Sequence, residues 1–232
     1  MTPWAWERFA CGLWTAGEEG AVSAREWAAC ADAELAIPEG ANGVVVGVNL
    51  GWKWDTTAIV PIRQGEDVIE VHPPAILIPP QDGRSLDANE VFGACEAMAE
   101  RWPGLTFALD PEAGGEQLAQ RLDAELDCTV MTHSQKAGPM CDASEQLATA
   151  IREGSIRHPN DAELNRHVLA AAARFYGVGW RFVKPKNKNL RIDGAVALAM
   201  AVRVLNSTEA TPKERSDDVR GPSNKIHLMG MS

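Results

Sequence analysis

Three short apolar segments of this sequence are each bounded by a polar residue, and these residues constrain the fold more than any other feature. Two of the segments are apolar throughout, as strands buried on both faces are, and the third is an apolar helix. Polar side chains at the ends of core strands and at a helix start are where two-metal sites that cut phosphodiester bonds are built. Because one of the three is an amide, it decides whether such a site cuts or only binds. The residues are Asn49 after 43–48, Asp110 after 105–109, and Asp193 within the apolar helix 192–201.

The length of the chain suits one substantial domain with short appendages. Its 232 residues can hold one core. Residues 1–40 are expected to form a helical lead-in segment, with a helix from 25 to about 35 that starts at the capping box of Ser23 and Glu26. Residues 41–206 form the domain itself. The tail 207–232 is rich in Ser, Asp, Lys, Arg, Pro and Gly, and we expect it to be disordered.

Composition argues against a membrane or extracellular setting. No apolar run approaches the roughly 20 residues that span a bilayer, and the first residues lack the basic flank and apolar stretch of a signal peptide. None of the five cysteines are paired at Cys-x-x-Cys spacing, so buried free thiols are expected rather than a zinc site. We therefore expect a cytoplasmic protein without a membrane partner.

The charge of the chain is unevenly distributed. A net charge of −10 opposes nonspecific binding to nucleic acid. One basic strip, however, suits a protein that meets DNA on a single face. The alternative is a solvated loop that merely keeps the chain soluble. The strip consists of Arg181, Lys184, Lys186, Lys188 and Arg191.

Three strands are expected in close succession after residue 43. They cover 44–50, 56–62 and 68–71, with a possible continuation at 75–78. The short turns between them imply an antiparallel meander.

Helices and strands then alternate, which implies parallel additions to the meander. The sequence therefore predicts an α/β fold with a mixed five-stranded sheet, three strands of it antiparallel, and helices on both faces. The expected helices are 87–102, 115–126, 142–153, 161–176 and 192–205, and the expected strands are 105–110, 128–132 and a short one at 180–183.

If the first strand lies beside the strand that ends at residue 110, Asn49 and Asp110 are neighbours. Adjacent strands lie about 4.8 Å apart, and two metal ions in a phosphoryl-transfer site lie about 3.5–4 Å apart. One oxygen ligand from each strand and a third from the last helix fit that spacing. The metal ions would activate water, so no protein nucleophile is needed.

Four segments of the sequence resemble the nuclease domain of tailed-phage terminase large subunits, which has an RNase H-like fold. The likeness runs from about residue 43 to 205, and residues 1–40 resemble the segment that joins the packaging ATPase to the nuclease. The last of the four segments is the most specific. They are 47–51 (GVNLG), 55–58 (DTTA), 109–111 (LDP) and 188–201 (KNLRIDGAVALAMA).

The resemblance implies an endonuclease that cuts double-stranded viral DNA during genome packaging with two Mg²⁺ or Mn²⁺ ions. Asp110 and Asp193 match two metal-binding aspartates, and Asn49 takes the place of the first. An amide offers one neutral oxygen instead of a bidentate anion, so activity should be impaired. Asp55 could partly compensate as a ligand, although a turn residue is the simpler interpretation. The implied partners are DNA, the terminase ATPase domain, the small subunit and the portal.

Further residues have both a functional and a structural interpretation. Trp52 and Trp54 flank the first turn and could stack on DNA bases, or could pack and anchor the loop. Lys184, Lys186, Lys188 and Arg191 are expected to contact phosphates. Glu112 could reach a metal ion through water, and the histidines are expected to be structural.

Two other classes of function stay open. The first is a non-catalytic DNA-binding or motor-docking module, which Asn49 favours and the two aspartates do not. The second is an actin-like or sugar-kinase-type phosphotransferase, which also begins with a Gly-x-Asp-x-Gly strand. Such enzymes need a duplicated domain and a second phosphate-binding loop, and the sequence shows neither.

Overall fold

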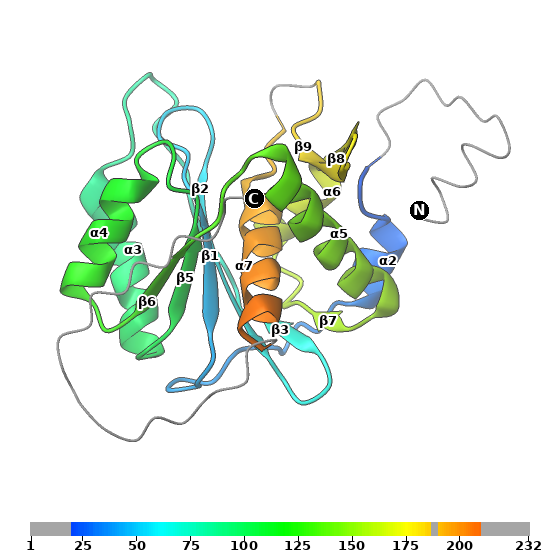
Figure 1. The fold of residues 1–232 in the computed structure, drawn as a ribbon, viewed down its shortest axis with the longest axis horizontal. Helices are drawn as coiled ribbons and strands as arrows, with labels where there is room; N and C mark the ends of the chain where they lie inside the picture. The colour runs from blue at the N-terminus through cyan, green and yellow to red at the C-terminus, as the bar shows by residue number, and fades with distance from the viewer. Residues whose placement is uncertain (1–19, 187–189, 210–232) are drawn as a thin grey trace, which may run out of the picture.

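A mixed sheet of seven strands forms the centre of the protein, in a computed structural model that describes residues 20–186 and 190–209 (Figure 1). The strand order is β6-β5-β1-β2-β3-β7, and β4 also pairs with β2. The α/β, RNase H-like fold predicted from the sequence is confirmed, with seven sheet strands where five were expected. The strands are β1 (Val45–Asn49), β2 (Thr57–Gln64), β3 (Ile69–Val71), β4 (Ala75–Leu77), β5 (Thr106–Leu109), β6 (Thr129–Thr132) and β7 (Ile156–Arg157).

The central strand β1 joins the antiparallel and the parallel parts of the sheet. It pairs antiparallel with β2, with Asn49 opposite Ala58, and parallel with β5, with Val48 opposite Leu109. All five of its residues are buried, as expected for a strand covered on both faces. The predicted meander is confirmed, because β2 pairs antiparallel with both β1 and β3.

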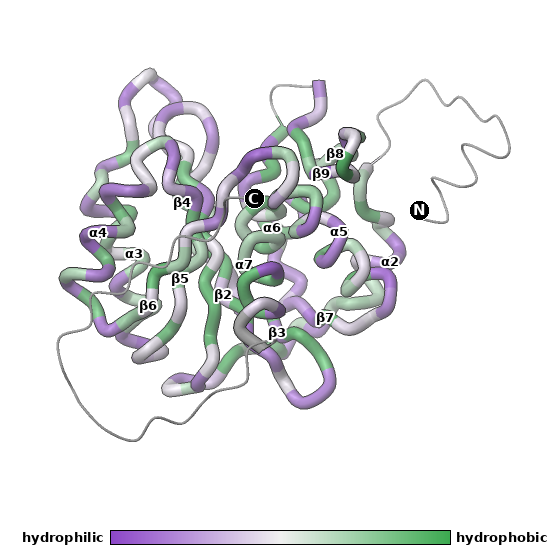
Figure 2. The backbone as a smooth tube through the Cα atoms, in the orientation of Figure 1, coloured by the Kyte–Doolittle hydropathy of each residue, from purple (hydrophilic) through white to green (hydrophobic). Residues whose placement is uncertain are grey.

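Helices cover the two faces of the sheet separately (Figure 1). One face carries α3 and α4, which pack on Val46, Val48 and Phe107. The other carries α5, α6 and α7, which pack with Val45 and Ala108. Figure 2 shows hydrophobic stretches along the sheet strands and hydrophilic ones on the outer parts of α2 and α4. The helices are α2 (Ala24–Ala29), α3 (Ala88–Arg101), α4 (Gly115–Glu125), α5 (Ala137–Glu153), α6 (Ala162–Ala170) and α7 (Asp193–Glu209).

Helix α7 lies directly against β1 because Gly47 has no side chain and faces alanines of the helix. A Cβ atom at Gly47 would lie 2.0 Å from the carbonyl oxygen of Ala197 and 3.1 Å from Cβ of Ala201. The side-chain-free position on β1 and the Ala-rich helix therefore fix how α7, and the residue at its start, sit over the strand ends.

Helices α5 and α6 differ from the expected bounds. Helix α5 begins at Ala137 with Lys136 as its N-cap, not at Asp142. Gly138 and Pro139 look like helix breakers, but proline is tolerated in a first helical turn. The expected helix 161–176 ends at Ala170, and the rest forms strand β8 (Ala172–Tyr176), which pairs with β9 (Gly179–Val183) in a separate two-stranded sheet. Strand pairing overrides the helix propensity of the Ala-rich run there.

The described part of the lead-in segment packs on the domain. Helix α2 ends at Ala29, not near residue 35. Its Trp27 is buried and stacks on His158 with ring centroids 3.7 Å apart, and the backbone N–H of Ile37 donates to Nδ1 of His72 at 3.0 Å. Residues 1–19 and most of the expected disordered tail lie outside the described residues. Among the helices described, none has both the length and the apolar character to cross a bilayer.

Candidate functional site

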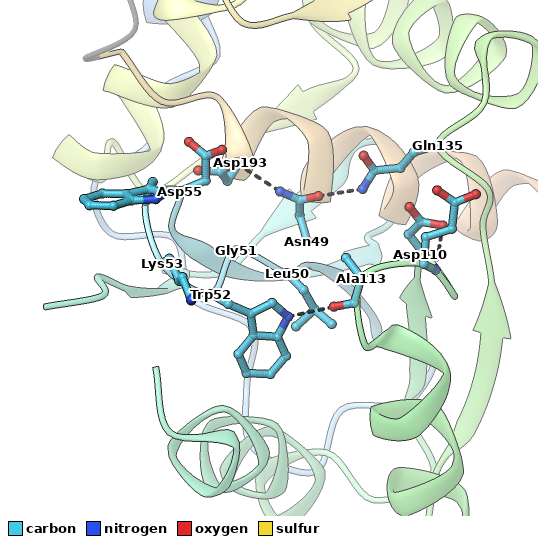
Figure 3. Close-up of a pocket in the computed structure, with 12 residues that line it drawn as sticks. Asn49, Leu50, Gly51, Trp52, Lys53, Asp55, Asp110, Ala113, Gln135 and Asp193 are labelled. Carbon is cyan, nitrogen blue, oxygen red and sulfur yellow. Dashed lines mark hydrogen bonds between the residues drawn. The ribbon is translucent and has the colours of Figure 1, made fainter. Parts of the chain in front are cut away.

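A cleft of about 470 Å³ opens where β1 and β5 end and α7 begins (Figure 3). It is lined by residues of the β1–β2 and β5–α4 loops, together with Gln135 and Asp193. The three predicted polar positions therefore share one cleft. The lining residues from the two loops are Asn49, Leu50, Gly51, Trp52, Lys53, Trp54 and Asp55 in the first, and Asp110, Glu112 and Ala113 in the second.

The parallel register of β1 and β5 places Asn49 beside Asp110, since Val48 is opposite Leu109. Side chains alternate between the two faces of a strand. Val45 and Ala108 face α7, so Asn49 and Asp110, four and two residues further along, are on the α7 face as well. The pairing of β1 with β5 and the alternation of side chains along each strand thus bring both polar side chains to the start of α7.

The carboxylate of Asp193 is buried and hydrogen-bonded at both oxygens. Its Oδ2 accepts from the backbone N–H of Thr56 at 3.1 Å and from the Thr56 hydroxyl at 2.6 Å, and its Oδ1 accepts from Asn49. Burial raises the pKa of Asp193; the two Thr56 hydrogen bonds and the charge of Lys184 act against this rise, while Asp55 adds to it. A buried carboxylate with a raised pKa in a cleft is typical of functional sites.

Helix α7 begins at Asp193, and His167 of α6 accepts a hydrogen bond from the first turn of this helix. Nδ1 of the buried His167 accepts the backbone N–H of Gly194 at 2.9 Å. Burial lowers the pKa of His167 to about 4, so the ring is neutral and able to accept near neutral pH. The structural role expected for this histidine is therefore a cap beside Asp193.

Asp110 is half-buried at the opposite side of the cleft floor. Its Oδ1 accepts from the backbone N–H of Glu112 at 3.3 Å. Desolvation raises the pKa of Asp110, and the charge of Glu112 raises it further, while backbone hydrogen bonds from Glu112 and Gln135 lower it. Glu112 is exposed and lines the cleft.

The amide of Asn49 bridges two side chains (Figure 3). Its Nδ2 donates to Oδ1 of Asp193 at 3.1 Å, and its Oδ1 accepts from Nε2 of Gln135 at 2.6 Å. The orientation of the amide follows from chemistry, because an ionised carboxylate has no hydrogen to donate and must face the NH₂ group. Asn49, only 7% exposed, therefore presents a donor to Asp193 where a metal ligand would present an oxygen.

Asp55 is already paired within the cleft. Its Oδ1 forms an ion pair with the ammonium of Lys184, which follows β9. In residues 20–186 and 190–209, no three His, Cys, Asp or Glu side chains are grouped as metal ligands would be. Asp55 and Lys184, one predicted as a ligand and the other as a phosphate contact, neutralise each other in this arrangement.

The two tryptophans have different environments. Trp52 is half-buried, and its indole N–H donates to the carbonyl of Ala113 at 2.7 Å, which anchors the β1–β2 loop to the β5–α4 loop. Trp54 is 60% exposed at the cleft. Of the two, Trp54 is the one with a ring face available for stacking.

The remaining predicted DNA contacts lie beyond β9. Lys186 is exposed, and Arg191 is half-buried near His167, whose pKa it helps to lower. Lys188 lies outside the described residues.

Two residues of the site were not predicted from the sequence. Thr56 is adjacent to Asp55, and its role depends on a carboxylate 137 residues away. Gln135 lies in the loop after β6 and meets Asn49 across 86 residues. Thr56 lies in the segment 55–58 that carries the resemblance, but no local pattern gives it this role, and none marks Gln135.

Comparison with solved structures gives strong matches to one group of proteins. The large terminase of bacteriophage HK97 matches with a TM-score of 0.68 and 21% identity over 80% of this chain and 43% of that one. The large terminase nuclease of thermophilic phage G20c with bound magnesium matches with a TM-score of 0.59 and 13% identity over 80% and 97% of the two chains. The chain has the fold of a large-terminase nuclease. No protein-family model and no curated protein sequence matches it.

The large terminase of another thermophilic bacteriophage gives a third match, with a TM-score of 0.58 and 12% identity over 86% of this chain and 49% of that one. The chain therefore spans less than half the length of the HK97 protein and of this third protein. The rest of those two proteins lies outside the aligned region.

The cleft contains oxygen donors, some of which already have partners. Asp110 and Asp193 supply the hard oxygen ligands that Mg²⁺ and Mn²⁺ prefer. Asn49 turns its NH₂ group toward Asp193, and Asp55 is paired with Lys184. Asn49 and Asp55 are therefore occupied by other partners in this arrangement.

Proposed function

We propose that this chain is the nuclease-fold module of a viral DNA-packaging motor, that it binds double-stranded DNA at the cleft, and that Asn49 impairs its hydrolysis of the phosphodiester backbone. The observation that carries the proposal is the convergence of Asn49, Asp110 and Asp193 in one cleft on a terminase-type fold. The setting would be the cytoplasm of a host cell.

The residues of the cleft would divide the work between them. Asp110 and Asp193 would hold Mg²⁺ or Mn²⁺, which when bound supplies an activated water and charge stabilisation. Thr56 keeps Asp193 oriented through two hydrogen bonds. The exposed Trp54 and the basic residues Lys186 and Arg191 would contact the DNA, and Lys184 would do so on leaving Asp55.

Asn49 removes one negative charge from the place where the ions would be gathered. A carboxylate there would face Asp193 at the present 3.1 Å separation, and two like charges that close require a cation between them or a shared proton. The Asn49 amide instead donates a hydrogen bond to Asp193, so no cation is needed between the two side chains. The affinity of the cleft for divalent ions should therefore be low.

The Asn49–Asp193 hydrogen bond also supports a second candidate, a non-catalytic DNA-binding or motor-docking module. The ATPase domain, small subunit and portal are proposed partners in either case, since the chain covers 43% of the HK97 large terminase. The three matched structures described above are large terminases, so they do not favour the phosphotransferase alternative.

A plasmid-nicking assay with Mn²⁺ or Mg²⁺ separates the two candidates. The chain itself should cut slowly, Asn49→Asp should cut at least about tenfold faster, and Asn49→Asp combined with Asp193→Asn should return to the background rate. Equal rates for all three, with DNA binding retained, would favour the non-catalytic module. Absence of DNA binding in all three would rule out the nuclease and the DNA-binding module, and would leave only the motor-docking form of the second candidate.

A further inference from the structure

A second cleft, of about 360 Å³, adjoins the first and has a basic wall. The two clefts share Asn49, Asp55, Gln135 and Asp193. The opposite wall of the second cleft comes from the β8–β9 hairpin, which contributes Arg174, Arg181, Phe182 and Val183. A strand of nucleic acid that leaves the first cleft in this direction would pass along the hairpin.

The hairpin has two chemically different faces. Trp180 and Phe182 are buried; the indole N–H of Trp180 donates to the carboxylate of Glu145 on α5, and the backbone N–H of Phe182 donates to the Ser144 hydroxyl at 3.1 Å. Arg174 and Arg181 are direct partners across the two strands. Directly opposite residues of an antiparallel pair project on the same side, so both arginines face the cleft.

Arg181 is held in place by neutral groups. Its Nη1 donates to the carbonyl of Gln135 at 2.5 Å, and its guanidinium carbon lies 5.4 Å from the centre of the Tyr176 ring. Its Nε is buried without a hydrogen-bond partner. Arg181 forms no ion pair with a carboxylate of residues 20–186 or 190–209.

Arg174 is exposed and likewise makes no ion pair within the described part of the chain. Lys184, by contrast, is already neutralised by Asp55. The two arginines are thus the cations of this cleft whose charge is not balanced by a carboxylate of the described residues. On a chain with a net charge of −10, such a pair is a local site for an anion.

We propose that Arg174 and Arg181 form a phosphate-binding subsite that grips the backbone of the DNA strand next to the acidic cleft. The inference rests on the proposed function, and it adds Arg174, which lies outside the basic strip, and pairs it with Arg181. Guanidinium groups suit this role because their planar donors match phosphate oxygens.

The subsite is also connected to the acidic cleft. Arg181 contacts the backbone carbonyl of Gln135, and the side chain of the same Gln135 donates to Asn49. A phosphate held by Arg181 is therefore at a fixed position relative to Asn49 and Asp193. The subsite would set the register of the strand as well as its affinity.

The test measures binding of a short labelled DNA duplex by fluorescence anisotropy over a range of salt concentrations. Arg174→Gln and Arg181→Gln should each weaken binding roughly tenfold and reduce the slope of log affinity against log salt by about 1. Arg121→Gln, on α4 across the sheet, removes the same charge and should leave both values within experimental error. Arg181→Lys should keep the salt slope.

The outcomes are distinct. If the chain and Arg121→Gln bind DNA, and Arg174→Gln binds equally well with the same salt slope, the subsite does not exist while the proposed function stands. Because Arg174 is exposed, its variant decides the matter even if Arg181→Gln fails to fold. If the unmodified chain does not bind DNA at low salt, the proposed function fails and the subsite with it. If the arginines bind inorganic phosphate alone, with DNA affinity unaffected by either variant, the site serves a free anion and the inference is wrong.

Discussion

The side-chain amide of Asn49 donates a 3.1 Å hydrogen bond to the carboxylate of Asp193, across 144 residues of sequence. Hydrogen bonds to an ionised group are stronger than those between neutral groups. This bond joins the end of β1 to the start of α7 without a metal ion. The stability of the chain should therefore not depend on divalent cations.

Replacing Asn49 by aspartate should make the stability of the chain depend on divalent cations. Without metal ions, Asn49→Asp should lower the free energy of unfolding by about 2 kcal/mol, because two buried carboxylates would face each other. Mg²⁺ should restore stability to the variant and have little effect on the unmodified chain. Thermal melts with and without chelator measure this. Asn206→Asp, the same change at an exposed position of α7, is the control and should not respond to Mg²⁺. A variant that melts like the unmodified chain in chelator would contradict the arrangement.

Substitution by alanine should have opposite effects on stability at two glycines, one in the close contact between β1 and α7 and one on an open face of α3. Gly47→Ala should destabilise the protein by at least about 3 kcal/mol, since the new methyl group would overlap the Ala197 carbonyl. Gly93→Ala, within α3 and with nothing near its would-be Cβ, should stabilise it by about 0.5–1 kcal/mol. Urea unfolding of both variants gives the comparison. Equal stabilities for the two would mean that α7 lies further from the sheet.

Buried neutral histidines should make the fold sensitive to acid. Burial, aided by Arg101, lowers the pKa of His72 from 6.5 to about 4, and His167 shows the same shift. Each folded-state pKa lies below the unfolded value, so the unfolded chain binds more protons between about pH 6.5 and 4, and stability falls as the pH falls through that window. Each histidine accounts for a loss on the order of 3 kcal/mol.

The raised pKa values of Asp110 and Asp193 act in the opposite direction, because the folded state takes up those protons more readily. Unfolding experiments at several pH values should show a net loss toward acid that is smaller in His72→Asn. The asparagine Oδ1 can take the place of Nδ1 of His72 as acceptor of the Ile37 N–H, and it does not titrate. An unchanged pH profile in His72→Asn would assign the acid sensitivity elsewhere.

The two tryptophans of the first turn should separate stability from binding. Trp54→Ala should weaken binding to DNA with unpaired bases by about 1–3 kcal/mol through lost stacking and change the free energy of unfolding by less than about 0.5 kcal/mol. Trp52→Phe should cost about 1 kcal/mol of stability by removing the hydrogen bond to Ala113, with little effect on DNA affinity. Anisotropy and thermal melts on both variants test the pair. If Trp52→Phe weakened DNA binding and Trp54→Ala lowered stability, the stacking residue would be Trp52 and the anchoring residue Trp54.

Local patterns in the sequence were sufficient for much of the fold. The apolar run before Asn49, the short turns after β1 and β2, and the capping residue Asp87, which accepts the backbone N–H of Asn89 at 2.8 Å, all act over a few residues. The signals failed where a distant partner overrides local preference. Residues 172–176 read as helix, but pair with β9 as a strand, and the start of α5 is hidden by Gly138 and Pro139.

By itself, the sequence determined which polar residues stand at the ends of apolar segments, because strand and helix periods are short-range properties of the chain. It could not determine what those residues touch. The contacts of Asn49 with Gln135 and Asp193, of Asp55 with Lys184 and of Arg181 with Gln135 each join residues 46 to 144 positions apart. Only the packing of α7 on the sheet, the pairing of β6 with β5 and the packing of the β8–β9 hairpin on α5 bring them together. Hydrogen bonds form over about 3 Å of space whatever the distance along the chain.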